Sequence, residues 1–204
     1  MSEDAIVHVI DDDVAVRRSL AFLLSSDGFA VRVHEGAGSF LADVPPGGNV
    51  CVVTDVRMPE IDGLEFLSRL RGRDATIPVI VMTGHADVPL AVEAMKRGAA
   101  DFIEKPFDDA LLLAAIRAAL ARQDGGGPAD PRSVESRDRM AKLSEREGQV
   151  LDGLIAGKPN KVIAFDLEIS PRTVEIYRAN VMTKMQAGSL SELVRLALQA
   201  GRTP

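Results

Sequence analysis

The chain has 204 residues, of which 46% are hydrophobic, and a formal net charge of −6. This length allows one or two domains with buried cores. The single cysteine, Cys51, excludes an internal disulfide framework, and the apolar runs are shorter than the ~18 residues of a membrane span. The first residues are acidic and do not resemble a targeting signal. We therefore expect a soluble, cytoplasmic protein.

The first 122 residues alternate between apolar runs typical of strands and stretches with helical periodicity. Strands are predicted at 6–10, 30–33, 50–54, 79–82 and 101–104. Helices are predicted at 14–27, 39–43, 64–70, 88–97 and 110–122, with Gly28 and Gly98 ending two of them. This alternation predicts an α/β domain with a five-stranded, doubly wound parallel sheet, whose ligands bind beyond the carboxyl ends of the strands.

Charged residues follow three of the predicted strands. Asp11, Asp12 and Asp13 come after the first strand, Asp55 after the third and Lys105 after the fifth. Because parallel strands end at one edge of the sheet, these side chains are expected to meet there. Crowded carboxylates repel one another unless a hard cation lies between them, and Mg²⁺ prefers oxygen ligands. The sequence therefore predicts a pocket for Mg²⁺ and a phosphoryl group.

An ordinary structural interpretation exists for each of these residues taken singly. An isolated Asp at a strand end is most often a helix cap or a turn residue, and we assign that role to Asp13, ahead of the helix at Val14. Phe102 taken alone would be a core residue. The ordered set of five elements described next is much less easily explained in this way.

Residues 4–122 resemble the receiver domain of two-component response regulators, which has a flavodoxin-like fold. The receiver pattern is an acidic pair, a phosphoacceptor Asp, a Thr or Ser and a Lys-Pro pair, placed after strands one, three, four and five. The matching residues are Asp11-Asp12, Asp55 in TDVRMP, Thr83 in VMTGH and Lys105-Pro106 in EKPF.

The resemblance implies a role for each of these residues. Asp55 would take the phosphoryl group as an acyl phosphate. Asp12 and Asp55 would bind Mg²⁺, with Asp11 acting through water and the Arg57 carbonyl supplying backbone oxygen.

The remaining receiver residues would respond to the phosphoryl group. Lys105 would pair with Asp55 and then with a phosphoryl oxygen, and Thr83 would donate its hydroxyl to that group. Phe102 would turn inward when Thr83 moves. The resemblance also implies that the Lys105-Pro106 peptide is cis.

Charge and composition change after residue 122. Residues 1–123 contain 12 Lys and Arg against 19 Asp and Glu, net −7, whereas residues 138–204 contain 10 against 8, net +2. The segment QDGGGPADPRS at 123–133 concentrates Gly, Pro and Asp, which do not continue a helix. We interpret 1–122 as one domain, 123–138 as a linker and 139–204 as a second domain.

The second domain is predicted to be all-helical. Ser144 and Glu147 have the spacing of a capping box, and the helix that follows ends near Gly157. A short helix is expected at 161–167, and Ser170-Pro171 begins a longer one that runs to about residue 186. A fourth helix is expected at 190–198.

A short helix joined tightly to a longer one is the pattern of a helix-turn-helix DNA reader. Residues 143–198 resemble the LuxR-type DNA-binding domain through LSEREGQVL, NKVIAFDLEIS, PRTVEIYRANVMTKM and SELVRLAL. With the receiver, they identify the chain as a member of the NarL/FixJ family. Within it, VPLAVEAMKRGAADFIEKPF and ISPRTVEIYRANVMTKM are especially similar to nitrogen-fixation regulators, although Tyr177 stands where the wider family usually has His.

Membership would imply a transcription activator of nitrogen-fixation genes. Its partners would be an oxygen-sensing histidine kinase, promoter DNA, a second copy of the phosphorylated chain and RNA polymerase. The modest charge of the second domain agrees with DNA binding by paired domains.

Helical geometry divides the longer helix into two faces. One face holds Val174, Tyr177, Val181, Met182 and Met185, and the opposite face holds Arg172, Ile176, Ala179 and Thr183. We expect Arg172, Glu175, Ile176 and Ala179 to reach base edges. Phosphate or structural contacts are expected of Lys161, Thr173, Arg178 and Lys184. The alternative is a solvated amphipathic helix.

Two other functional classes share part of this pattern. A Mg²⁺-dependent phosphatase or phosphotransferase also uses a strand-end Asp, but its usual second Asp is replaced by Arg57. A ligand-sensing LuxR regulator would need an apolar pocket instead of clustered carboxylates. We expect a regulator with no independent enzymatic role.

Overall fold

The computed structural model describes residues 5–44, 49–84, 88–123 and 131–202. The chain forms two compact units, the first comprising residues 1–86 and 96–126 and the second residues 87–95 and 127–204. Within the described ranges, no helix combines the length and the apolar character that crossing a membrane requires.

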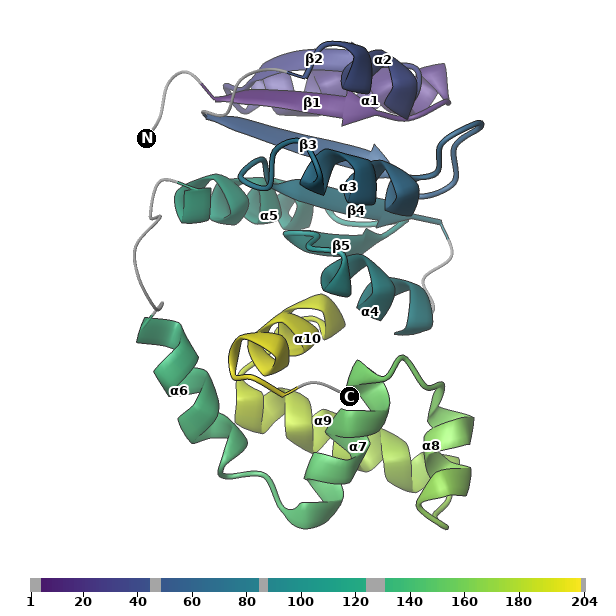
Figure 1. The fold of residues 1–204 in the computed structure, drawn as a ribbon, viewed down its shortest axis with the longest axis vertical. Coiled ribbons are helices and arrows are strands. Elements are labelled where there is room, and N and C mark those ends of the chain that lie inside the picture. Colours follow the sequence, from purple (N-terminus) through teal and green to yellow (C-terminus); the bar gives the residue numbers. More distant parts are fainter. Residues whose placement is uncertain (1–4, 45–48, 85–87, 124–130, 203–204) are drawn as a thin grey trace. The chain divides into compact units, whose positions relative to one another are not determined.

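The first unit is built on one parallel sheet (Figure 1). Its strands are β1 (Ile6–Ile10), β2 (Ala30–His34), β3 (Val50–Asp55), β4 (Val79–Thr83) and β5 (Asp101–Glu104), in the spatial order β2-β1-β3-β4-β5. In the register, Ile10 lies opposite Thr54, Asp55 opposite Met82 and Thr83 opposite Glu104. The strands therefore end together, which confirms the predicted doubly wound sheet.

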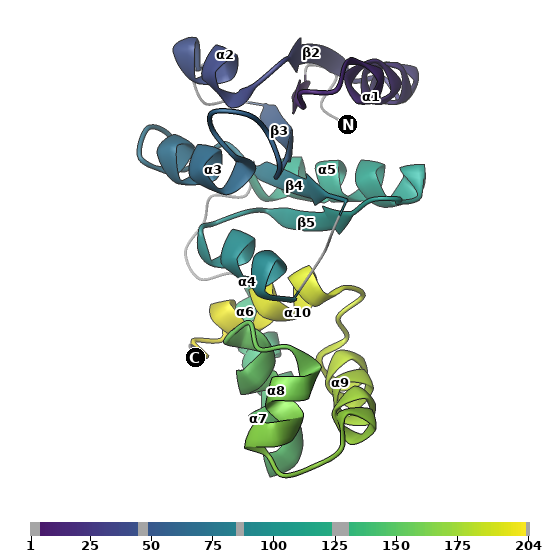
Figure 2. The ribbon, with the colours of Figure 1, turned by 90° about the vertical axis from the view of Figure 1, so that its right-hand side faces the viewer.

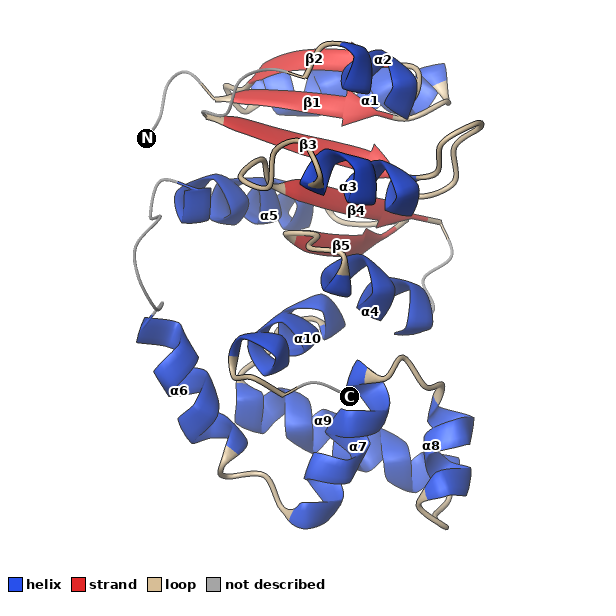
Figure 3. Ribbon diagram, viewed as in Figure 1, coloured by secondary structure: helices blue, strands red, loops and turns tan. Residues whose placement is uncertain are grey.

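Helices flank this sheet (Figures 2 and 3). The helices α1 (Val14–Ser26) and α5 (Asp109–Gln123) cover one face, and α2 (Ala37–Ala42) and α3 (Gly63–Arg71) cover the other. Along the chain, α4 (Val88–Lys96) connects β4 to β5. The observed bounds differ from the predicted ones by no more than two residues at any end.

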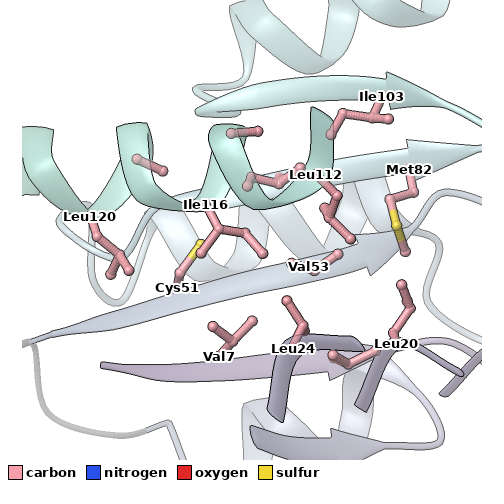
Figure 4. Close-up of a cluster of buried hydrophobic side chains, with 14 of the residues drawn as sticks. Val7, Leu20, Leu24, Cys51, Val53, Met82, Ile103, Leu112, Ile116 and Leu120 are labelled. Atoms are coloured by element: carbon pink, nitrogen blue, oxygen red, sulfur yellow. The ribbon is translucent and has the colours of Figure 1, made fainter. Parts of the chain in front are cut away.

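Apolar side chains fill the layer between the central strands and the helices α1 and α5 (Figure 4). Every residue of β3 and β4 is buried, as expected for central strands of a parallel sheet that is covered on both faces. Leu24 of α1 and Ile116 of α5 are fully buried against them. This core fixes the positions at which the central strands end.

An aromatic cluster occupies the other face. The rings of His8 and His34 are stacked with centroids 5.1 Å apart, and Phe40 lies edge-on to both. His8 Nδ1 is 2.9 Å from His34 Nε2. Burial of His8, with the nearby His34 and Arg32, lowers the pKa of His8 to about 4. His8 is therefore neutral in the folded protein at neutral pH.

The second unit contains four helices at the predicted places: α7 (Glu145–Ile155), α8 (Asn160–Asp166), α9 (Pro171–Met185) and α10 (Leu190–Gln199). Their apolar faces share one core, which includes Leu151, Leu154, Ile163, Val181 and Leu193. The capping box is present at α7, and Ser170 caps α9 with Pro171 at its start. Gln186 adopts the left-handed conformation that ends α9.

A further helix, α6 (Pro131–Met140), lies within and just after the predicted linker. We had expected no helix there because Gly, Pro and Asp are abundant. Proline is nevertheless compatible with the first position of a helix, where its missing N–H is not needed. Met140 packs against the core of the second unit, and α6 contacts α9 and α10. The predicted linker residues 124–130 lie outside the described residues.

Candidate functional site

The centre of the predicted site is an ion-pair triad at the carboxyl edge of the sheet. Lys105 Nζ lies 2.9 Å from Asp11 Oδ2 and 2.7 Å from Asp55 Oδ1. Asp11 is 2% exposed and Asp55 9% exposed. The three residues follow or end three different strands, so the parallel fold has brought together groups far apart in the sequence. The predicted meeting of these side chains is thus observed.

Asp55 is held by backbone as well as by Lys105. Its second carboxylate oxygen, Oδ2, accepts a hydrogen bond of 2.6 Å from the Arg57 amide. The turn after β3 closes with a bond of 2.8 Å from the Gly63 amide to the Val56 carbonyl. Each carboxylate oxygen of Asp55 therefore has a defined donor, and the carboxylate is oriented before any ligand binds.

Gly63 supports the site, and no pattern in the sequence singled it out. A Cβ built on Gly63 would overlap the Asp55 carbonyl oxygen and lie 2.9 Å from Val56 Cα. Only glycine lets the first turn of α3 approach the end of β3 this closely. The DG pair at 62–63 is a signal of a turn or a helix start, but it does not reveal which backbone lies against it.

The three consecutive aspartates have three different environments. Asp11 is buried, and its Oδ1 accepts a bond of 2.9 Å from the Asp13 amide. Asp12 is exposed beside it. Asp13 accepts a bond of 2.7 Å from the Ala15 amide and caps α1, as predicted. Three neighbouring aspartates at the end of β1 therefore have different roles: the first is a buried carboxylate, the second is exposed to solvent and the third caps a helix.

Two opposing effects act on Lys105. Burial lowers the pKa of the ammonium group, but its hydrogen bonds to Asp55 and Asp11 outweigh burial and raise the pKa above its ordinary value. Lys105 is therefore a permanent cation at neutral pH. It balances one of the negative charges that Asp11, Asp12 and Asp55 bring to this edge, which leaves an excess of carboxylate charge.

The other receiver residues lie on β4 and β5. Thr83 ends β4 and is buried, and its carbonyl accepts a bond of 2.7 Å from the Lys105 amide. Phe102 is buried at 8% exposure, two strands from Asp55 in the sheet order. The Lys105-Pro106 peptide is cis, which confirms that expectation.

The donor set suits a hard cation, but it is not a closed cage. In the described part of the chain, no three His, Cys, Asp or Glu side chains are arranged so that together they could hold a metal ion. Lys105 bridges Asp11 and Asp55, and Asp12 faces outward. Carboxylate oxygens and the Arg57 carbonyl are nevertheless ligands of the type that Mg²⁺ prefers, and the excess negative charge at this edge favours a divalent cation.

Helix α9 has the two faces predicted for it. Val174, Val181 and Met185 are fully buried, and Tyr177 and Met182 are partly buried in the core of the second unit. All four expected base-edge residues are exposed, and Ile176 is 56% exposed although it is a large apolar residue. The exposed residues are Arg172, Glu175, Ile176 and Ala179.

The four residues expected to be phosphate or structural contacts differ in environment. Lys161 is exposed on α8, and Thr173 and Arg178 are half-buried on α9. Lys184 is also exposed, and its Nζ lies 2.7 Å from Glu147 Oε2. The bond from Lys184, together with the Ser144 amide, lowers the pKa of Glu147 to about 2. The capping-box pattern identified Glu147 but gave no sign of this partner 37 residues away.

Comparisons with known proteins agree with the family resemblance of both halves of the chain. Residues 7–117 match the response regulator receiver domain, and residues 141–197 match the bacterial regulatory proteins of the luxR family. The chain is 61% identical to the transcriptional regulatory protein FixJ of Azorhizobium caulinodans, covering 100% of this chain and 97% of that protein. It is 42% identical to the response regulator TodT of Pseudomonas putida F1, covering 96% and 87%.

Among solved structures, the full-length FixJ of B. japonicum matches with a TM-score of 0.58 and 53% identity. The match covers 98% of each chain.

Proposed function

We propose that phosphorylation of Asp55 switches the DNA binding of this protein. The proposal starts from its family, because the chain belongs to the NarL/FixJ family of two-component response regulators, which are DNA-binding transcription activators of the FixJ type. The observation that carries the proposal is the geometry at Asp55. This carboxylate ends a buried strand, and one of its oxygens accepts a hydrogen bond from Lys105 while the other accepts one from the Arg57 amide.

Asp55 would act as the nucleophile. One carboxylate oxygen attacks the phosphorus of a phosphohistidine in the donor kinase, the bond from phosphorus to the histidine nitrogen breaks, and an acyl phosphate forms on Asp55. When Mg²⁺ is bound, it offsets the charge shared by the acceptor and the phosphoryl group. Asp11, Asp12 and Asp55, with the Arg57 carbonyl, are the residues we assign to the metal, Asp11 acting through water.

Lys105 and Thr83 would detect the product. The ammonium group of Lys105 already lies 2.7 Å from Asp55, so it can move to a phosphoryl oxygen without crossing the site. The hydroxyl of Thr83, at the end of the neighbouring strand, would donate to another phosphoryl oxygen. Phe102 would change its packing in response, since it lies on the strand next to Thr83.

The switch would act through dimerisation. A receiver of residues 1–122 and a DNA-binding domain of residues 139–204 would be joined by the segment 123–138, whose last part is helical in α6. Phosphorylation would favour a receiver dimer, which would place two DNA-binding domains on adjacent half-sites. Unphosphorylated receivers would restrain DNA binding.

The partners follow from the same proposal. A FixL-like sensor histidine kinase would supply the phosphoryl group, and the dimer would bind promoter DNA of nitrogen-fixation genes under low oxygen. It would activate transcription with RNA polymerase in the cytoplasm. The names of the FixJ relatives support this assignment. We assign the protein no independent enzymatic role beyond its own phosphorylation and dephosphorylation.

Intact mass measurement after incubation with acetyl phosphate and Mg²⁺ tests the acceptor. We expect one added phosphoryl group on the wild-type chain, located at Asp55, and a dimer in sedimentation. Asp55→Asn should show neither change, because the amide keeps the shape but is not a nucleophile. Asp13→Asn is the matched control, since Asp13 is a nearby carboxylate that caps α1, and it should still be phosphorylated. Phosphate on the Asp55→Asn chain would contradict the assignment.

A further inference from the structure

Glu147 is an unusual residue for the interior of a DNA-binding domain. Its side chain is 5% exposed, and its Oε2 accepts a bond of 2.7 Å from the Ser144 amide within the capping box. A buried carboxylate is stable only when it is paired and hydrogen-bonded. The partner is Lys184 Nζ, 2.7 Å away, on the recognition helix α9. The start of α7 and the end of α9 are therefore joined by charge.

The same end of α9 is held by backbone contacts. Lys184 Nζ also lies 3.4 Å from the Lys142 carbonyl. The carbonyl of Met185, a fully buried residue, accepts a bond of 3.3 Å from Arg139 Nη1 of α6. The last turn of the recognition helix is thus attached by side chain and by backbone to residues 139–147.

The residues expected to read bases lie at the other end of the helix. Glu175 is nine residues before Lys184, which is about 13 Å along a helix axis. A tilt of about 5° at the attached end would move Glu175 by about 1 Å, enough to disturb a bidentate contact with a base. Contacts at the far end therefore control the accuracy of reading.

Lys184 is poorly suited to grip a phosphate. Moving its ammonium group to DNA would leave the buried carboxylate of Glu147 without its charge partner. The free energy gained from a solvent-screened phosphate contact is smaller than the cost of that unpaired charge. Lys161, on the neighbouring helix α8, is exposed like Lys184 but forms no ion pair with a described residue, so it has no such conflict. The two lysines therefore differ in what they can contribute to binding.

We propose that Lys184 is a positioning residue for sequence reading, acting through Glu147, and not a phosphate contact. The sequence left Lys184 either a phosphate contact or a structural contact, and this proposal favours the structural role. It rests on the DNA-binding assignment of the second unit. It predicts that specificity, not the ionic part of the affinity, depends on Lys184.

The test uses the full-length phosphorylated chain and two duplexes of equal length. One duplex is selected from a random-sequence pool by the wild-type protein, and the other has a scrambled sequence. Equilibrium binding to both is measured at several salt concentrations. K184A should lower the ratio of specific to non-specific affinity by about tenfold or more, while the slope of log K against log salt stays at the wild-type value. K161A is the matched control and should lower that slope by about one and keep the ratio.

Two further variants separate positioning from simple destabilisation. E147Q, which touches no DNA in this proposal, should reduce the specificity ratio as K184A does, and the double variant should be no worse than either single one. K184R should restore the ratio. Folding is followed through Tyr177, the single tyrosine of a chain without tryptophan. If K184A does not fold, E147Q and K184R carry the test.

Three results would overturn the proposal. A salt slope reduced by about one in K184A, with the ratio unchanged, would make Lys184 a phosphate contact. An unchanged ratio in folded K184A, with only a lower unfolding midpoint, would make the pair purely structural. An unchanged ratio in E147Q would remove Glu147 from the mechanism. Failure of the wild-type chain to prefer any duplex would instead contradict DNA reading itself.

Discussion

Each unit of this protein places a lysine on a buried carboxylate, and the two arrangements serve different ends. In the first unit Lys105 is shared between Asp11 and Asp55, with the exposed Asp12 beside them, so carboxylates outnumber the cation. In the second unit Lys184 meets Glu147 one to one, and the same Glu147 oxygen also accepts the Ser144 amide. An excess of carboxylates favours a further cation, whereas the balanced pair joins two helices.

Removing a carboxylate from the unbalanced cluster should have the largest effect. Asp12→Ala deletes the exposed member that we assign to Mg²⁺, so phosphorylation by acetyl phosphate should slow by at least about 100-fold. The rate should be measured across a Mg²⁺ titration. The matched control is Asp43→Ala, an aspartate at the end of α2 that belongs to no predicted site. An unchanged Mg²⁺ dependence in Asp12→Ala would mean that charge at this edge is not what binds the metal.

The backbone support of Asp55 provides the next test. Gly63→Ala should destabilise the first unit by about 1–3 kcal/mol, because the new methyl group overlaps the Asp55 carbonyl region. It should also slow phosphorylation by moving the end of β3. Both effects are measured by urea unfolding and by the acetyl phosphate reaction.

Gly72→Ala is the control for the Gly63 prediction. Its φ of −72° is helical, and the nearest atom to a new Cβ is 3.5 Å away, so the change should be neutral or slightly stabilising. Equal effects of the two substitutions would show that close packing at Gly63 is not important for the site.

Base recognition by the second unit should depend on Glu175, an exposed residue in the N-terminal half of α9. Glu175→Ala should relax the preference at one base position in each half-site by about 1–3 kcal/mol, because a carboxylate can accept from cytosine. Competition binding against operators varied base by base measures this loss. Unchanged base preferences would mean that the reading face is rotated, and Arg178 would become the next candidate.

The smallest expected effect is a difference between the two units in how their stability falls at acid pH. The pKa of His8 is about 4 in the folded chain and 6.5 for an ordinary histidine, so the first unit loses stability as pH falls from 6.5 towards 4, by about 1 kcal/mol at pH 5.5. Glu147, with a pKa of about 2 when folded against 4.5, costs the second unit stability only as pH falls below 4.5. Tyr177 fluorescence reports on the second unit, and hydrogen exchange in β1 and β2 reports on the first. Parallel losses at pH 5.5 would contradict the difference.

Local patterns predicted the elements well because their causes are local. The apolar run at 50–54 became a central strand, and Ser144, Ser170 and Pro171 began helices as their capping chemistry requires. The helix α6 was missed because a high content of Gly, Pro and Asp outweighed the compatibility of Pro131 with a helix start. Asp13 was assigned as a cap from its place before Val14, and that assignment is confirmed.

The site was predicted in part. The order of strands implied that Asp11, Asp55 and Lys105 would meet, and they do. The environment of each aspartate was not predictable, because burial of Asp11 and exposure of Asp12 depend on how the end of β1 turns under its neighbours. Gly63 was missed for a related reason, since the atom that excludes a side chain there belongs to a strand eight residues earlier.

The sequence by itself determined the alternation of strands and helices, the edge of the sheet at which charge gathers and the two faces of the recognition helix. These follow from periodicity and from the rule that parallel strands end together. Tertiary structure alone decided that Lys184 pairs with Glu147. Helical spacing places a lysine on a face of its own helix, but it carries no information about a carboxylate on another helix. That pairing arises only when packing buries the Glu147 carboxylate and brings the exposed Lys184 ammonium group beside it.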